Sequence, residues 1–292
     1  MLELQIQISS DKVRKVQIAY GQTPILQGIR SIEVREVSEE LLEAVVRHPG
    51  LRELDMLYTN MNYLKPWILA SLVMKMEKIA LCPSGGSSGS LTPQQLTSLC
   101  QHIKDSDHMK SLHLERMDIS AVEPKLLADA VSTLEEVNLT LTELTARQVN
   151  DIFLGLQTNT RMKSLNLTQN DLSTVDPNIL GETMSRISKV DLGQTRLTTQ
   201  QATSVCSAQK ENTALTSLNL RFNNLSSVNP WILSEAVSTL SKVDLSFCQL
   251  NTHQVLSLCA VLKSETELTR LDLTGNNLVL VLKEVLQDPR LH

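Results

Sequence analysis

The sequence has few aromatic residues for its length. It contains two Trp, three Tyr and three Phe among 292 residues, although 41% of the chain is hydrophobic. Such a chain can bury a large core, but its aromatic side chains are too scarce to form that core. Leucine must fill the interior instead, and the chain holds 50 leucines, about 17% of its residues.

Cysteine, excess positive charge and long apolar runs are also scarce, and each absence excludes a class of protein. Five cysteines, an odd number without a CxxC pair, form no disulfide scaffold, so we expect a reducing, cytoplasmic compartment. The net charge is −5 without a basic stripe, which argues against a nucleic-acid partner. No run of about 18 apolar residues occurs and the start does not resemble a signal peptide, so we expect no membrane partner.

A short hydrophobic strand pattern recurs along most of the chain and indicates an internal repeat. Its first apolar position is occupied by Leu54, Ile79, Leu112, Val137, Leu165, Val190, Leu218, Val243 and Leu271. From Leu112 onward the spacing alternates between 25 and 28 residues, so the full unit has 53 residues. The step from Ile79 to Leu112 is 33 residues and contains the run CPSGGSSGS. We interpret residues 84–90 as a mobile Gly/Ser loop inserted into one repeat.

Each strand pattern is followed by a helix pattern, and alternate helices have different start signals. The longer repeats place Thr or Asn three residues before Gln, which predicts a capping box. These pairs are Thr92 and Gln95, Thr145 and Gln148, Thr198 and Gln201, and Asn251 and Gln254. The shorter repeats place Pro at the first helical position, where its missing N–H costs no hydrogen bond. These prolines are Pro66, Pro124, Pro177 and Pro230.

The repeats follow the pattern LxxLxLxxNxL, with Asn170, Asn223, Asn276 and Cys248 in the asparagine position. We expect the Asn side chains to satisfy backbone groups where the chain turns. The pattern resembles the leucine-rich repeats of the ribonuclease-inhibitor type, which also occur in NOD-like receptors, and it covers roughly residues 50–285. The resemblance implies an α/β solenoid shaped as a horseshoe, with parallel strands on the concave face and helices on the convex face.

Both ends of the repeat array are predicted to be caps. Residues 2–8 and 13–20 alternate at strand period, which predicts a hairpin. Ile32 and Val34 mark the strand of a truncated first repeat, whose helix is expected from Ser38 to His48. We expect an N-terminal cap at residues 1–50, leucine-rich repeats at 51–277 and a C-terminal capping helix at 278–292.

No motif predicts an enzyme. Residues 85–89 match GxSxG, but they lie in a Gly/Ser excess without the packed turn that holds a nucleophile. Cys100, His102, His108 and His113 match no zinc spacing, and Cys100 belongs to an apolar helix stripe. The sequence contains no P-loop, dinucleotide-binding turn or calcium loop. We predict no catalytic residue, no cofactor and no metal.

Two rows of positions are candidates for a binding surface. The residues between the two inward hydrophobes of each strand form a polar row. This row either contacts only solvent or is a recognition strip for a partner. Its members are Asp55, Ala80, His113, Asn138, Asn166, Asp191, Asn219, Asp244 and Asp272. The second residue after each strand's last hydrophobe reads Tyr58, Pro83, Arg116, Leu141, Gln169, Gln194, Phe222, Phe247 and Gly275. Two of the three phenylalanines occupy this second row in adjacent repeats, past the inward pair, so we expect them to be exposed and to bind a partner. The predicted partner-binding residues are Tyr58, His113, Arg116, Arg221, Phe222, Asp244 and Phe247.

The sequence predicts a non-enzymatic module that recognises a protein partner through the concave face, either as a monomer or as part of a larger chain. The alternative is a ligand-sensing or autoinhibitory domain of a NOD-like innate immune receptor, in which the horseshoe holds a neighbouring ATPase module inactive. A nucleotide-binding module upstream would select this second hypothesis.

Overall fold

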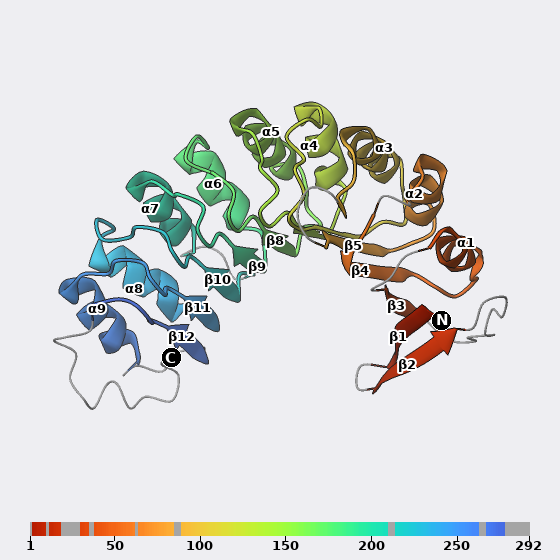
Figure 1. Ribbon diagram of the computed structural model, residues 1–292. Coiled ribbons are helices and arrows are strands. Elements are labelled where there is room, and N and C mark those ends of the chain that lie inside the picture. The colour runs from red at the N-terminus through yellow and green to blue at the C-terminus, as the bar shows by residue number, and fades with distance from the viewer. Residues whose placement is uncertain are drawn as a thin grey trace. The chain divides into compact units, whose positions relative to one another are not determined.

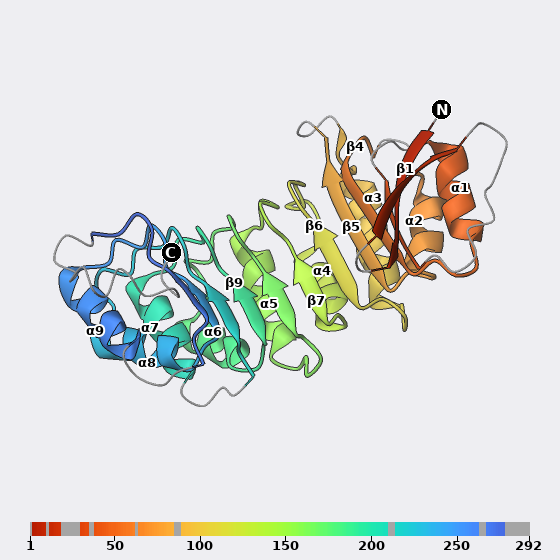
Figure 2. The same ribbon diagram turned by 90° about the horizontal axis from the view of Figure 1, so that it is seen from below.

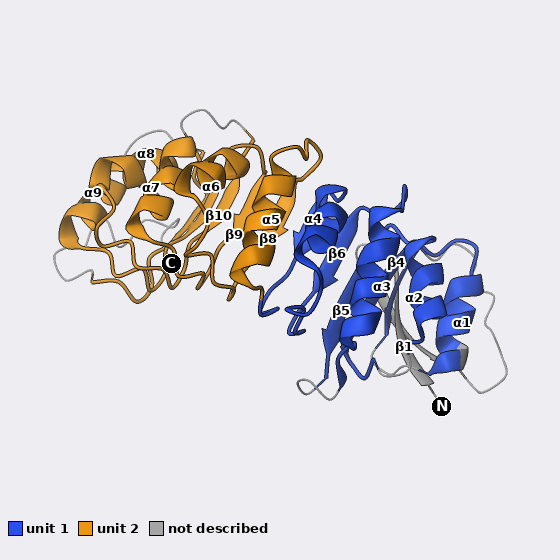
Figure 3. Ribbon diagram, turned by 90° about the horizontal axis from the view of Figure 1, so that it is seen from above, with its two compact units in different colours: residues 1–143 blue, residues 144–292 orange. Residues whose placement is uncertain are grey.

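The computed structural model describes residues 2–9, 12–18, 30–34, 38–61, 64–84, 89–209, 214–262 and 267–277. The chain divides into two compact units, Met1–Glu143 and Leu144–His292 (Figure 3). Each unit is a sheet with helices on one face, so strands and helices form two layers (Figure 1). The boundary between the units falls within the repeats.

Unit 1 begins with a hairpin and continues as parallel strands that alternate with helices (Figure 2). The strands are β1 (Leu2–Ser9), β2 (Lys12–Ile18), β3 (Ser31–Val34), β4 (Glu53–Thr59), β5 (Lys78–Pro83), β6 (Ser111–Leu114) and β7 (Glu136–Asn138). The helices are α1 (Glu39–Arg47), α2 (Pro66–Val73), α3 (Pro93–Lys104) and α4 (Pro124–Ser132). Strands β1 and β2 are antiparallel, β1 pairs with β3 at Gln5 and Glu33, and β3 to β7 are parallel. The predicted hairpin and the short first repeat are therefore present.

Unit 2 repeats the same arrangement. Its strands are β8 (Ser164–Asn166), β9 (Lys189–Asp191), β10 (Ser217–Asn219), β11 (Lys242–Asp244) and β12 (Arg270–Asp272), all parallel. Its helices are α5 (Ala146–Leu156), α6 (Pro177–Met184), α7 (Thr199–Ala208), α8 (Pro230–Ser238) and α9 (Thr252–Leu262). Both units are α/β leucine-rich repeat solenoids, as the sequence predicts.

The strand register follows the repeat spacing. Leu218 on β10 pairs with Val190 on β9 and with Val243 on β11, which are the residues that the 25 and 28 spacing brings into line. Leu218 and Leu220 are both buried. Because side chains alternate along a strand, the two hydrophobes point into the core and the residue between them lies on the opposite face. We call this opposite face the strand face.

The predicted helix starts are confirmed. The Thr92, Thr145 and Thr198 hydroxyls accept hydrogen bonds from the backbone N–H of the Gln three residues later, and each of these Gln side chains accepts one from the N-cap backbone. Asn251 and Gln254 exchange the same two bonds at the start of α9. The second kind of start, with Pro first, occurs at α2, α4, α6 and α8.

The asparagine positions connect neighbouring repeats. The buried Asn223 side chain accepts a hydrogen bond from the Leu197 N–H at 3.0 Å and donates to the Leu192 and Leu220 carbonyls at 2.7 and 3.0 Å. In the fourth such position the Cys248 thiol donates to the Leu220 carbonyl at 3.2 Å. These bonds satisfy backbone groups that the turn would otherwise bury unpaired.

The cysteines are part of the interior. Burial raises the pKa of Cys100 and of Cys206 to about 12. Burial is also the main reason that the pKa of Cys248 is raised to about 12. A thiol with such a pKa is protonated at neutral pH and packs as a small apolar group. The predicted core role of Cys100, Cys206 and Cys259 is confirmed, since all three are buried.

Three further expectations have different outcomes. Ala80 was expected to point outward with the polar row, but it is only 3% exposed. Its register neighbours are Asp55 and His113, whose side chains are longer, so the short methyl group is recessed between them. The centre of the Gly/Ser loop, residues 85–88, and the C-terminal capping helix, residues 278–292, lie outside the described residues. In the part of the chain that is described, no helix has the length and apolarity needed to cross a bilayer.

Candidate binding surface on the strand face

The row that contains both phenylalanines has an unusual backbone. Its residues adopt positive φ angles: Tyr58, Arg116, Leu141, Gln169, Gln194, Phe222, Phe247 and Gly275. This left-handed region costs a residue with a Cβ about 1–2 kcal/mol. The conformation turns the backbone N–H toward the next repeat, since Phe222 donates to the Ser246 carbonyl at 3.0 Å and Phe247 to the Thr274 carbonyl at 2.7 Å. The turn therefore positions an exposed residue past the carboxyl end of most strands. Pro83 is the exception in this row: it is buried and has no positive φ, because its ring fixes φ at about −65°.

Phe222 and Phe247 form a stacked aromatic pair in unit 2. Their ring centroids are 4.6 Å apart and the rings are 2° from parallel. The side chains remain 49% and 46% exposed, in contrast to Phe153 of α5, which is fully buried. Stacking is worth about 0.5–1.5 kcal/mol, and it fixes both rings in one orientation on the surface. An exposed, rigid aromatic pair can bury area against a partner at low entropic cost.

Glycine occupies the two positions where this surface needs space. A Cβ on Gly275 would lie 2.4 Å from two atoms of the Phe247 ring, so the ring packs directly over the glycine. A Cβ on Gly193 would lie 2.9 Å from the Cγ of Arg221, which crosses that glycine in the same way. Each glycine thus supports one of the predicted binding residues.

The polar row has a structural role that the sequence analysis missed. Asp244 accepts hydrogen bonds through Oδ1 from the Ser246 backbone N–H at 2.9 Å and from its hydroxyl at 2.6 Å. The same bond to the backbone N–H two residues later is made by Asn138, Asn166, Asp191, Asn219 and Asp272. Asn and Asp are the residues that favour this turn, so their recurrence at this position of the repeat is the sequence signal that indicates the structural role. The first role of this row is therefore to end the strands. Some of its outer atoms also bond to neighbouring side chains, as the Asn219 amide does when it donates to Oδ2 of Asp191 at 3.0 Å.

A polar hollow lies on the strand face of unit 2. Its volume is about 270 Å³, and its lining includes Asp191, Asn219, Lys242, Asp244, Arg270 and Asp272. These side chains come from β9 to β12, so the hollow crosses four adjacent strands. Of the predicted set, Phe222 and Phe247 are in contact, Arg221 precedes Phe222 in the same turn, and Asp244 lines the hollow, all within unit 2.

The other predicted residues belong to unit 1. Tyr58 is 66% exposed near the end of β4, and Arg116 is exposed directly after β6. His113 on β6 is half-buried, with Nε2 3.3 Å from the Ser111 hydroxyl. Burial, and after it the charge of Lys78, lowers the pKa of His113 from its usual value, so the imidazole is neutral at pH 7.

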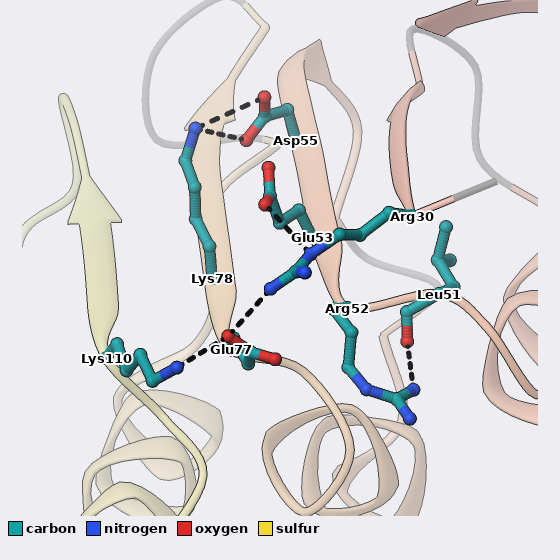
Figure 4. A network of polar contacts seen from close by, with 8 residues as sticks. All are labelled: Arg30, Leu51, Arg52, Glu53, Asp55, Glu77, Lys78 and Lys110. Carbon is teal, nitrogen blue, oxygen red and sulfur yellow. Dashed lines mark hydrogen bonds and ion pairs between the residues drawn. The ribbon is translucent and has the colours of Figure 1, made fainter. Parts of the chain in front are cut away.

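Unit 1 also carries a network of ion pairs on its strands (Figure 4). Lys78 of β5 lies 3.2 Å from Oδ1 of Asp55 on β4. Below them Glu77 accepts from Lys110 at 2.7 Å and from Arg30 at 3.1 Å. The Lys110 bond is the main reason that the pKa of Glu77 is lowered. The charges of Arg30, Glu77 and Lys110 lie next to the starts of β3, β5 and β6, and they are paired with one another.

The geometry defines the chain as a leucine-rich repeat solenoid with a polar and aromatic strand face. A leucine-rich repeat family model matches residues 214–236. The porcine (Sus scrofa) ribonuclease inhibitor is 24% identical over 72% of this chain and 48% of its own length. The bovine (Bos taurus) NACHT, LRR and PYD domains-containing protein 5 is 26% identical over 90% of this chain and 25% of its own length. The chain therefore spans about half of the first relative and a quarter of the second.

Solved structures share the fold. A chain in the crystal structure of the Rad7 and Elc1 complex from yeast has a TM-score of 0.59, with 15% identity, over 90% of this chain and 73% of that one. Taken with the repeat architecture, this chain has the leucine-rich repeat fold, and it is similar to the ribonuclease inhibitor and to the leucine-rich repeats of NOD-like receptors. Repeats of this type are protein-interaction modules and typically lack enzymatic activity.

Proposed function

We propose that this chain is a non-enzymatic recognition module whose concave strand face binds a protein partner. The observation that carries the proposal is the exposed stack of Phe222 and Phe247. Interface hot spots are enriched in rigid aromatic and Arg side chains, and Arg221 lies beside the stack. The yeast structure with a similar fold is a protein complex, which supports the same class of function. Tyr58, His113 and Arg116 are proposed as secondary contacts on unit 1.

The test replaces both phenylalanines with alanine and compares the recovery of partners by quantitative affinity purification. Folding should be nearly intact, because the inward Leu and Val positions form the core. Binding should weaken by about 2 kcal/mol or more, roughly thirtyfold. The matched control is Trp231→Ala, which removes a 69% exposed aromatic from the helix face of the same unit. Equal recovery by the Phe variant and the control would exclude the stack as the hot spot.

The second candidate is the sensing or autoinhibitory domain of a NOD-like receptor in the cytoplasm. The bovine relative, of which this chain matches a quarter, favours it. In that protein class we propose that the solenoid restrains a neighbouring ATPase module. Sequencing the complete transcript tests the hypothesis, because a nucleotide-binding module upstream would select it. Absence of that module from the complete transcript would select the free-standing recognition module.

The domain boundaries follow from the same proposal. We propose a cap at residues 1–50, repeats at 51–277 and a capping helix at 278–292. Capping segments shield the apolar ends of a solenoid. A chain that lacks residues 1–50 should associate with itself through the uncovered end of the repeats. Sedimentation velocity of this variant and of the full chain, which is expected to be a monomer, measures the difference.

A further inference from the structure

We infer that the strand face of unit 2 recognises a protein segment that presents an acidic, a basic and an apolar side chain in that order. The inference rests on the proposed function and specifies the chemistry of the partner. Its basis is three bands of side chains on this face: the first two lie on β11 and β12, and the third lies in the turns after β10 and β11. Lys242 and Arg270 form the first band, Asp244 and Asp272 form the second, and the stack of Phe222 and Phe247 forms the third.

The first two bands are like-charged pairs in register. Lys242 pairs with Arg270 across the two strands, and Asp244 pairs with Asp272. Neighbouring strands lie about 4.8 Å apart, and like charges directly opposite each other destabilise a sheet. Among the described residues, neither cation forms an ion pair within 4.0 Å. A partner that places an opposite charge over each pair removes both repulsions at once.

The two carboxylates are preoriented for such a contact. Each accepts backbone hydrogen bonds only through Oδ1, at 2.9 Å from Ser246 N for Asp244 and 2.9 Å from Thr274 N for Asp272. Within the described part of the chain, Oδ2 of each carboxylate has no hydrogen-bond partner. Two parallel carboxylate oxygens on neighbouring strands fit the donors of an Arg or Lys side chain. The polar hollow of about 270 Å³ is lined by both carboxylates and by both cations, so a side chain can enter between them.

The spacing of the bands fits one continuous segment. The cationic and anionic bands are two residues apart along each strand, which is about 6.6 Å. An extended peptide places alternate side chains at the same interval. The aromatic pair lies past the carboxyl ends of β10 and β11, and the Phe247 ring extends over Gly275 in the turn after β12. An apolar side chain of the segment would cover the rings there. Charge complementarity and shape therefore point to the same occupant.

The chain itself supplies variants that keep the fold. Asp244→Asn with Asp272→Asn removes both charges, and Asn166 and Asn219 already make the same turn bond at this register. Lys242→Ser with Arg270→Ser copies Ser217, which lies in register with Lys242 on β10. A matched control is Asp151→Asn with Asp176→Asn, which changes the net charge equally on the helix side.

The experiment selects binders from a phage-displayed library of random dodecapeptides on the purified full chain. Fluorescence polarisation then measures the affinity of the selected peptides for each variant. We expect enriched peptides to carry Asp or Glu, then Arg or Lys, then an apolar residue. The Asp244→Asn and Asp272→Asn variant should lose about tenfold or more in affinity. The Ser variant should weaken only peptides that have the acidic residue, and added salt should weaken all charge-dependent binding.

The outcomes separate this inference from the proposed function. Peptides that lose affinity for the Phe222→Ala and Phe247→Ala variant, but bind the Asn variant as they bind the control, would overturn the inference and leave the proposed function standing. Peptides insensitive to every strand-face variant would count against both. Enriched peptides without a basic residue, or no enriched peptide, would also overturn the inference, because a continuous charged segment would then not be the ligand.

Discussion

Gly275 supports the aromatic pair, and its replacement by alanine tests the proposed surface most directly. Its φ of +71° lies in the left-handed region, and an added Cβ would sit 2.4 Å from the Phe247 ring. Carbon atoms cannot approach so closely, so the ring has to leave Gly275 and, with it, its stacked position on Phe222. Gly275→Ala therefore introduces a backbone cost and a stacking cost at the same time.

The two costs can be separated by magnitude. The left-handed backbone costs alanine about 1–2 kcal/mol. Loss of the stack adds about 0.5–1.5 kcal/mol. In a Phe247→Ala background the ring is absent, so Gly275→Ala should then cost only the first amount. The coupling energy between the two positions should equal the second amount.

The assay is urea unfolding of the four proteins of this double-mutant cycle, followed by far-UV circular dichroism. Equal dependence on urea across the four proteins shows that the free energies of unfolding can be compared. Equal costs of Gly275→Ala in both backgrounds would mean that the ring does not lie over the glycine. The stack, and with it the preformed hot spot, would then be refuted.

Four further outcomes are expected. Leu220→Ala, at a fully buried position, should cost about 2–5 kcal/mol, and a shift of the melting temperature below about one degree would contradict the repeat register. Asn223→Ala should cost about 1–3 kcal/mol, since the buried Leu197 N–H loses its partner and the Leu192 and Leu220 carbonyls each lose one of their donors; a loss below about 0.5 kcal/mol in urea unfolding would be inconsistent with those bonds. Cys206, with its pKa raised to about 12, should react with a thiol reagent at pH 8 only after urea is added, and rapid labelling of the native chain would show that the site opens. The pKa of His113 is lowered in the fold, so the unfolded chain binds more protons than the folded chain. The contribution of His113 to the free energy of unfolding is therefore complete above about pH 6.5 and decreases as the pH falls. In urea unfolding between pH 7.5 and 5.5, a His113→Asn variant should lack this decrease, and identical pH profiles of the two proteins would contradict the reasoning.

Most of the fold could be predicted because its determinants are local and periodic. Alternating hydrophobes fix which residues of a strand face the core, and the recurrence of Leu218 and its equivalents fixes the register. Capping boxes and first-turn prolines each act within four residues, so Thr198 or Pro230 marks a helix start without any tertiary information.

The candidate surface was only partly predictable, because it depends on backbone angles and on contacts between repeats. Residues such as Phe222, Arg116 and Gln194 do not favour positive φ, so their row could not be recognised as a left-handed turn. Gly275 was the one member of the row whose residue type indicated this conformation. Stacking of the phenylalanines depends on the distance between strands, and burial of Ala80 depends on the length of its neighbours' side chains.

The polar row explains how such a scaffold can change its ligand while it keeps its fold. Asn219 and Asp244 make the same bond through Oδ1 to the backbone two residues later. An exchange between Asn and Asp therefore alters the charge of the strand face and leaves the strand ending unchanged. The row of positive-φ residues that contains both phenylalanines also accepts different side chains. Its turn is fixed by the backbone N–H that bonds to the next repeat, and both Gln194 and Phe222 adopt it. Buried leucines and asparagines specify the solenoid, and the two rows on the strand face are the positions at which we propose that the partner is recognised.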